Sequence, residues 1–294
     1  MNNKDLKKVV ESALDKQKVP HVKLKKIGAS KVDVASLTEP SKETRQEYWG
    51  KGLTYCAIIL IIILVASIIG FIGFHGLETF TKDHVNVFQF LTSSDWDPGE
   101  GKNHVGAAAM IVTSFSVTLL AALVATPFAI AVALFMTEYS SKKGARFLQS
   151  VIELLVGIPS VVYGFLGLTV IVPFIRNIFG GTGFGILSAT LVLFVMVLPT
   201  ITSLTVDSLK AVPSDYRKAS LALGATKWQT IYKVILRVAS PRIMTAVIFG
   251  MARAFGEALA VQMVIGNAVL MPANLVSPSA TLTSQLTSQM GNTV

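Results

Sequence analysis

The chain has 294 residues, of which 52% are hydrophobic and 15% are charged, and its formal net charge is +9. A soluble domain carries about 25% charged residues, so this composition excludes an ordinary soluble protein. A helix needs about 20 mostly apolar residues to cross a bilayer, because lipid cannot pair with free backbone groups. Several long runs without Lys, Arg, Asp or Glu therefore predict an all-α, polytopic membrane protein. The runs are Gly52–Leu77, Val105–Thr137, Leu154–Ile175 and Asn177–Val206.

The basic residues are distributed unevenly along the chain. Residues 1–51 hold 12 Lys and Arg, and the connections near 138–146 and 207–242 are also basic, whereas the connection near 78–104 is mainly acidic. By the positive-inside rule, this alternation predicts a plasma-membrane protein with a cytoplasmic N-terminus. The positive charge is thus explained as a topology signal, and no nucleic-acid partner is expected. Cys56 is the only cysteine, so neither an intrachain disulfide nor a metal site is expected.

The N-terminal tail, residues 1–51, is polar and mixed in charge, with helical spacing only near 5–17. We expect a largely disordered or partner-dependent cytoplasmic segment. The remainder, 52–294, is expected to form a transmembrane domain.

Five spans are expected. Their approximate ranges are 52–74, 106–136, 149–173, 184–206 and 242–266. The second is longer than a bilayer needs and must tilt, kink at Pro127 or project from the membrane. Pro159 and Ser160 interrupt the third, where a broken helix can offer backbone groups to a solute; a plain kink is the simpler explanation. Glu138 and Glu153 lie at predicted boundaries and are expected to be solvated carboxylates.

Residues 207–241 form the one long cytoplasmic connection that we expect. Its sequence fits two short amphipathic helices, the first capped by Ser214 or Asp215 and stopped by Gly224, the second beginning near Thr226. A helix–Gly–helix unit suits docking into a groove of another protein. A surface helix that covers the base of the bundle is the structural alternative.

Two charges, Arg253 and Glu257, lie within the fifth span in the stretch ARAFGEALA. In a continuous helix their spacing places them on one face. Burying either charge alone costs at least about 2.5–3.5 kcal/mol, and an apolar pair is often no less stable, so stability explains them poorly. A guanidinium matches an oxyanion with planar, bidentate donors. We expect Arg253 and Glu257 to line a substrate pathway; an ion pair that fixes helix packing is the alternative.

The 207–241 connection resembles the coupling loop of ABC importer permeases, whose pattern is Glu-Ala-Ala, three residues, Gly, nine residues and Ile-x-Leu-Pro. Here the first triplet is Lys218-Ala219-Ser220, the glycine is Gly224 and the last element is Val234–Arg237. Lys218 replaces the usual acid, Ser220 an alanine and Arg237 a proline. The resemblance implies that Lys218, Ala219, Ser220 and Gly224 couple to an ATPase.

Further segments resemble the permeases of the high-affinity phosphate importer, the Pst system. They are ALFMTEYSS, IELLVGIPSVVYGFLGL, KASLALGATKWQTIYKVIL, ARAFGEALAVQMVIGN and the external DWDP. GEALAVQMVIGN favours the C-type subunit over its A-type paralogue. The resemblance covers about 52–294 and implies the MetI-like fold of a type I permease, which catalyses no covalent chemistry.

The same resemblance implies the partners. They are a paralogous A-type permease, two ATP-binding subunits, an external phosphate-binding protein and membrane lipid. It implies no cofactor in this chain, because ATP and magnesium belong to the partner subunits. It carries a transport role over to Arg253 and Glu257. It also implies a sixth span beyond Val294, so we expect the native chain to be longer.

These observations predict the permease subunit of an ATP-driven importer of inorganic phosphate. Sulfate or molybdate is an alternative substrate, because charge alone does not separate oxyanions. A membrane scaffold that senses phosphate without transporting it is another alternative. A membrane-embedded enzyme that uses Glu257 as an acid or base is disfavoured, since no nucleophile, histidine or metal set accompanies that residue in the fifth span.

Overall fold

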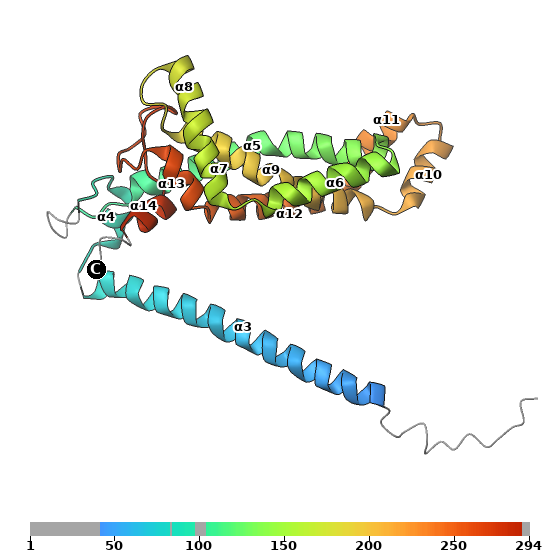
Figure 1. The fold of residues 1–294 in the computed structure, drawn as a ribbon, viewed down its shortest axis with the longest axis horizontal. Coiled ribbons are helices and arrows are strands. Elements are labelled where there is room, and N and C mark those ends of the chain that lie inside the picture. Colours follow the sequence, from blue (N-terminus) through green and yellow to red (C-terminus); the bar gives the residue numbers. More distant parts are fainter. Residues whose placement is uncertain (1–41, 83, 98–103, 290–294) are drawn as a thin grey trace, which may run out of the picture. The chain divides into compact units, whose positions relative to one another are not determined.

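The computed structural model describes residues 42–82, 84–97 and 104–289. The chain divides into two units, Met1–Phe74 and His75–Val294. Helices make up the regular structure of the described residues, apart from two isolated bridges (Figure 1). Within this described part, five helical stretches are long and apolar enough to cross a membrane, which confirms the all-α membrane class. They are Glu47–Thr81, Ala108–Tyr139, Ser160–Phe179, Ile186–Lys210 and Lys227–Phe255.

Helix α3, Lys42–Thr81, contains the first span. It begins ten residues before the predicted start at 52, so the expectation of disorder is wrong for 42–51. An ion pair one turn apart, Glu47–Lys51 at 2.7 Å, supports this extra helix. The central residues of α3 are apolar on every face, as a helix surrounded by lipid requires. The helical spacing near 5–17 lies outside the described residues.

The second unit is built on three long helices, α5 (Ala108–Leu134), α9 (Ile186–Lys210) and α12 (Leu236–Phe255). Small residues recur every fourth position of α5 and are fully buried against α9. These residues are Ala121, Ala125 and Ala129, and they share a core cluster with Leu193, Val197 and Ile201 of α9. Small side chains let helix backbones approach closely, which drives helix association where lipid is as apolar as the helix surface.

The third span differs from its predicted range, 149–173. Helix α6, Lys142–Gly157, is a separate amphipathic helix, and the span comprises α7 (Ser160–Leu166), a π-helical turn (Gly167–Ile171) and α8 (Val172–Phe179). Pro159 caps α7 in an extended conformation, and a residue before proline is disfavoured in helix. The prediction was wrong because the apolar face of α6 merges with α7 in the sequence.

The fifth span also differs from its predicted range, 242–266. Helix α11 (Lys227–Thr230) continues through a π-helical turn (Ile231–Ile235) into α12 without a break. The helix then ends at Phe255, and α13 (Leu259–Ile265) begins after a short break. The second of the two predicted short helices is therefore the start of the span. No glycine or proline lies between Lys227 and Arg237, so nothing stops the helix there.

The short elements of the second unit lie at its two ends (Figure 1). Helices α10 (Ser214–Ala222) and α11 are at one end. Helices α4 (Val87–Thr92), α13 and α14 (Leu282–Gln289) are at the other. The α10–α11 connection and α14 are thus separated by the length of the bundle.

Gly250 of α12 lies where α12 crosses α9, and a substitution there tests this packing. A Cβ at Gly250 would meet Ile201 Cγ1 at 2.5 Å, and Ile201 is fully buried. We expect Gly250→Ala to destabilise the protein by about 1–3 kcal/mol through overpacking. The measurement is the thermal unfolding midpoint in detergent. Gly157→Ala is the control, since a Cβ there meets nothing within 4 Å; an equal midpoint for both variants contradicts the expectation.

Candidate functional site

Arg253 lies in the last turn of α12 and contacts the middle of α9. Its Nη1 donates a hydrogen bond to Thr200 Oγ1 at 2.6 Å. Thr200 follows Pro199, which lies inside the 25-residue helix α9. Both Arg253 and Thr200 are half-buried. The guanidinium therefore lies near the mid-length of the spanning helix α9, held by a neutral hydroxyl, and among the described residues it forms no ion pair.

Glu257 lies in the break between α12 and α13. Its Oε1 accepts a hydrogen bond from the Ala260 backbone N–H at 3.0 Å, so the carboxylate caps the N-terminus of α13. Its backbone carbonyl accepts from Thr283 Oγ1 at 2.9 Å. Within the described part of the chain, Arg253 and Glu257 form no ion pair with each other. The shared helical face predicted from their spacing is wrong, because the helix ends at Phe255.

A small polar cavity of about 10 Å³ adjoins Glu257. Its polar lining comes from Ser114 and Thr118 of α5 and from Thr281 and Thr283 beside α14. Ser114 Oγ also accepts a hydrogen bond from the Leu282 backbone N–H at 3.0 Å, which fixes the start of α14 against α5. A cavity of this size holds about one water molecule. The carboxylate thus has a hydroxyl-rich surrounding inside the bundle.

Pro159 and Ser160 lie at the second break, between α6 and α7. Tyr163, about one turn after Ser160, donates its hydroxyl to the Leu155 carbonyl at 2.8 Å across this break. Tyr163 belongs to the same buried cluster as Ala254, the residue after Arg253. The structure therefore brings the start of α7 near the end of α12, while no hydrogen bond among the described residues joins Pro159 or Ser160 to Arg253.

Sequence reasoning missed Thr200 and Tyr163. Both lie in apolar spans, where nothing distinguishes them from their neighbours. The hydrogen-bond partner of Thr200 is distant in the sequence, and that of Tyr163 lies across the break before α7. The only available signal was position: Thr200 directly follows a proline, and Tyr163 comes four residues after another. Helix-breaking residues free nearby backbone groups, and hydroxyls close to them can satisfy those groups.

The α10–α11 connection has the helix–Gly–helix form predicted for it. Gly224 has a φ of +80°, the left-handed conformation that ends a helix. Thr226 and Gln229 form a reciprocal capping box at the start of α11, with hydrogen bonds of 2.9 and 3.2 Å. Lys218, Ala219 and Ser220 lie on α10. Ser220 Oγ and Thr230 Oγ1 are 2.9 Å apart, which links the two helices.

Apolar side chains are exposed on this connection. Leu223 is 89% exposed beside Gly224. Trp228 and Tyr232 are exposed and stack on each other, with ring centroids 6.4 Å apart. Large exposed apolar side chains that gather in one place are typical of a surface that binds another protein.

Glu138 is not the solvated carboxylate that its place in the sequence predicts. Its side chain is 6% exposed and forms an ion pair with Arg217 of α10. Its backbone carbonyl accepts a hydrogen bond from Lys227 Nζ at 2.5 Å, and that ammonium lies 4.7 Å from the Tyr139 ring centroid. The π-helical end of α5, Phe135–Tyr139, is thereby tied to both helices of the connection. Glu153, by contrast, is exposed as expected.

The fold and these sites define a polytopic membrane protein with polar groups inside its bundle and exposed apolar side chains on a connection at one end. Residues 125–291 match the model of the "Binding-protein-dependent transport system inner membrane component" family. The chain belongs to this family, whose members are permease subunits of ABC importers. It is therefore a multi-pass membrane subunit that is not itself an enzyme, and it works with ATP-binding subunits and a substrate-binding protein.

Similar proteins include "Probable ABC transporter permease protein YqgH" of Bacillus subtilis, which is 51% identical and whose alignment covers 86% of this chain and 83% of the relative. "Phosphate transport system permease protein PstC" of Mesorhizobium japonicum is 33% identical over 82% of this chain and 78% of the relative. A solved structure of the methionine transporter MetNI in inward-facing conformations matches with a TM-score of 0.47 and 24% identity, covering 64% of this chain and 79% of that chain.

The buried ion pair at the end of α5 gives a prediction for Glu138→Gln. Removing the carboxylate charge leaves Arg217 without its partner, which costs about 1–3 kcal/mol. We expect a lower thermal midpoint and faster hydrogen–deuterium exchange of the α10 amides. Glu153→Gln, at an exposed carboxylate that accepts a hydrogen bond from Gln149, is the control. Unchanged exchange of α10 in Glu138→Gln would show that the ion pair does not hold the connection.

Proposed function

We propose that this chain is a permease subunit of an ATP-driven importer of inorganic phosphate. Arg253 carries the proposal, because its guanidinium lies at mid-span with a hydroxyl as its hydrogen-bond partner rather than a carboxylate. A cation left uncompensated inside a membrane protein is costly and marks a solute pathway. The planar donors of a guanidinium suit a tetrahedral oxyanion. Several relatives at 30–33% identity are named phosphate transport system permease proteins.

Arg253 and Glu257 have separate roles in this proposal. Arg253 attracts the anion at the middle of the bundle. Glu257 holds the break that ends α12 beside it, by capping α13. Pro159 and Ser160 open a second break, and the helix that follows it, α7, packs against α13. The two breaks supply the irregular backbone that a solute site between spans requires.

The proposed assembly follows from the two ends of the second unit. The ATP-binding subunit docks on α10 and α11, through Lys218, Ala219, Ser220 and the turn at Gly224. The basic connection then lies on the cytoplasmic side together with the N-terminus. A paralogous A-type permease completes the pathway as a heterodimer within the lipid bilayer, and a phosphate-binding protein delivers the substrate from outside.

Arg253→Gln tests the proposed substrate. The complete complex is placed in proteoliposomes, and ATP-dependent uptake of labelled phosphate is measured with and without excess sulfate. Losing a charge-assisted hydrogen bond to the anion is expected to reduce the uptake rate at least about tenfold, and Arg253→Lys should restore only part of it. Arg146→Gln, at an exposed arginine of α6, is the control. Full uptake by Arg253→Gln would refute the role of Arg253, and stronger inhibition by sulfate than by unlabelled phosphate would refute phosphate as the substrate.

Gly224 tests the proposed docking surface. Nothing lies within 4 Å of a Cβ built at Gly224, so a side chain there is opposed only by the left-handed backbone. Forcing a leucine into that conformation costs about 1–2 kcal/mol. We expect Gly224→Leu to distort the turn and weaken co-purification of the ATP-binding subunit, while Gly224→Asn, which tolerates this conformation, retains it. Equal co-purification of both variants would contradict this role.

A further inference from the structure

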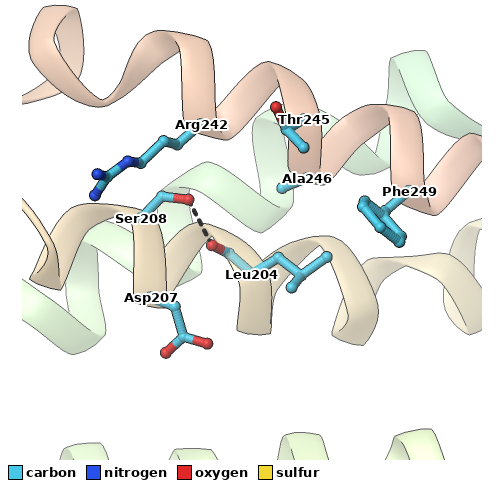
Figure 2. Close-up of a pocket in the computed structure, with 7 residues that line it drawn as sticks. All are labelled: Leu204, Asp207, Ser208, Arg242, Thr245, Ala246 and Phe249. Carbon is cyan, nitrogen blue, oxygen red and sulfur yellow. Dashed lines mark hydrogen bonds between the residues drawn. The ribbon is translucent and has the colours of Figure 1, made fainter. Parts of the chain in front are cut away.

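A groove of about 320 Å³ lies between α9 and α12, and Figure 2 shows the residues that line it. Along α12 these residues precede Arg253, on the side that leads back to α11. Arg242 and Thr245 of α12 line it together with Asp207 and Ser208 of α9. Leu204 and Phe249 also line it. Within the described part of the chain, none of these residues is hydrogen-bonded to Arg253, whose partner is Thr200.

Arg242 and Arg253 share one face of α12. They are 11 residues apart (253 − 242), which is about three helical turns. On α9, Thr200, Leu204 and Ser208 follow each other at four-residue spacing and also share a face. Helices α9 and α12 are packed together, and Thr200 contacts Arg253 directly. The face of α12 with Arg242 and Arg253 therefore meets the face of α9 with Thr200, Leu204 and Ser208, and we call this contact line the α9–α12 seam.

The two arginines are separated along the seam by about 16 Å, from the rise of an α-helix. That distance is about half the thickness of the hydrocarbon core. With Arg253 at mid-span, Arg242 therefore lies near the membrane surface at the α10–α11 end. Leu204 and Phe249 lie between the two arginines, so an anion that moves along the seam crosses one apolar step.

The charge of Arg242 is available to a ligand. Arg242 is exposed, and among the residues that the structure describes it forms no ion pair. The nearest acid in the groove, Asp207, is directed away from it in Figure 2. Ser208 is uncharged and therefore offers Arg242 no counter-charge. Its hydroxyl donates a hydrogen bond to the Leu204 carbonyl at 2.7 Å.

We propose that Arg242 is a second oxyanion-binding station, which binds a phosphoryl group at the inner end of the α9–α12 seam. The inference rests on the proposed transport of phosphate through Arg253. Transport through a pore requires sites strong enough to admit an ion and weak enough to release it, which several moderate sites achieve better than a single tight one. Arg242 then receives the anion from Arg253 and passes it to the cytoplasm.

Uptake by the complete complex in proteoliposomes provides the first test. We expect Arg242→Gln to reduce the rate of phosphate uptake about tenfold, as for the loss of one charge-assisted hydrogen bond. Arg242→Lys should recover part of the rate, and Arg146→Gln should match the wild type. Uptake by Arg242→Gln equal to that of Arg146→Gln would overturn the proposal. If the wild type carries sulfate instead, phosphate transport fails as the function, and the same variants measured with sulfate still decide the role of Arg242.

Residue-resolved labelling with phenylglyoxal distinguishes free phosphate from a lipid headgroup. The complex in nanodiscs is labelled with and without inorganic phosphate, and the modification of Arg242 and Arg146 is compared by mass spectrometry. We expect phosphate to slow labelling of Arg242 severalfold and to leave Arg146 unchanged. Protection that ignores added phosphate but increases with the content of phosphatidylglycerol assigns Arg242 to lipid and overturns the proposal, as does equal labelling of both arginines under all conditions. This readout also decides the matter if the wild type transports neither anion.

Discussion

Every break in a membrane-spanning helix must have its freed backbone groups satisfied inside the protein, because lipid offers no hydrogen bonds. This constraint determines the site. At the break after α12, the Glu257 carboxylate accepts from the Ala260 N–H and the Glu257 N–H donates to the Ala254 carbonyl at 3.2 Å. At the break before α7, the Tyr163 hydroxyl reaches the Leu155 carbonyl. Both breaks thus persist because a side chain replaces the missing helical partner.

The same constraint explains why the two charges of ARAFGEALA are separated. A carboxylate that caps a helix N-terminus is already stabilised by backbone N–H groups and by the helix dipole. Glu257 therefore does not need Arg253 as a partner. Arg253 is left to Thr200 and, in the proposed function, to the transported anion. In the proposed function Glu257 determines where α12 ends, and Arg253 binds the anion at that end.

The general architecture could be predicted from the sequence because it depends on local properties. Long apolar runs indicated the spans, and Gly224 with Thr226 indicated the turn of the α10–α11 connection, since backbone conformation and capping depend on neighbouring residues. The fourth span was predicted at 184–206 and is found at Ile186–Lys210. The ends of the third and fifth spans could not be predicted, because an apolar run does not reveal whether its helix continues through or stops at a given residue.

The contacts of the site depend on residues distant in the sequence. Arg217 lies 79 positions from Glu138, and Thr200 lies 53 positions from Arg253. Nothing near Glu138 distinguishes a buried, paired carboxylate from a solvated one at a membrane boundary. The shared face expected for Arg253 and Glu257 was wrong, because a four-residue spacing was interpreted on a helix that ends between the two residues.

The uninterrupted helix from Lys227 to Phe255 has a mechanical consequence. It is about 43 Å long, from the rise per residue, and it joins the exposed aromatic surface at Trp228 directly to Arg253. The helix contains a π-helical turn at Ile231–Ile235 and Pro241, and it continues through both to Phe255. The helical break at Gly256 follows Arg253, so the arginine belongs to the same continuous helix as Trp228.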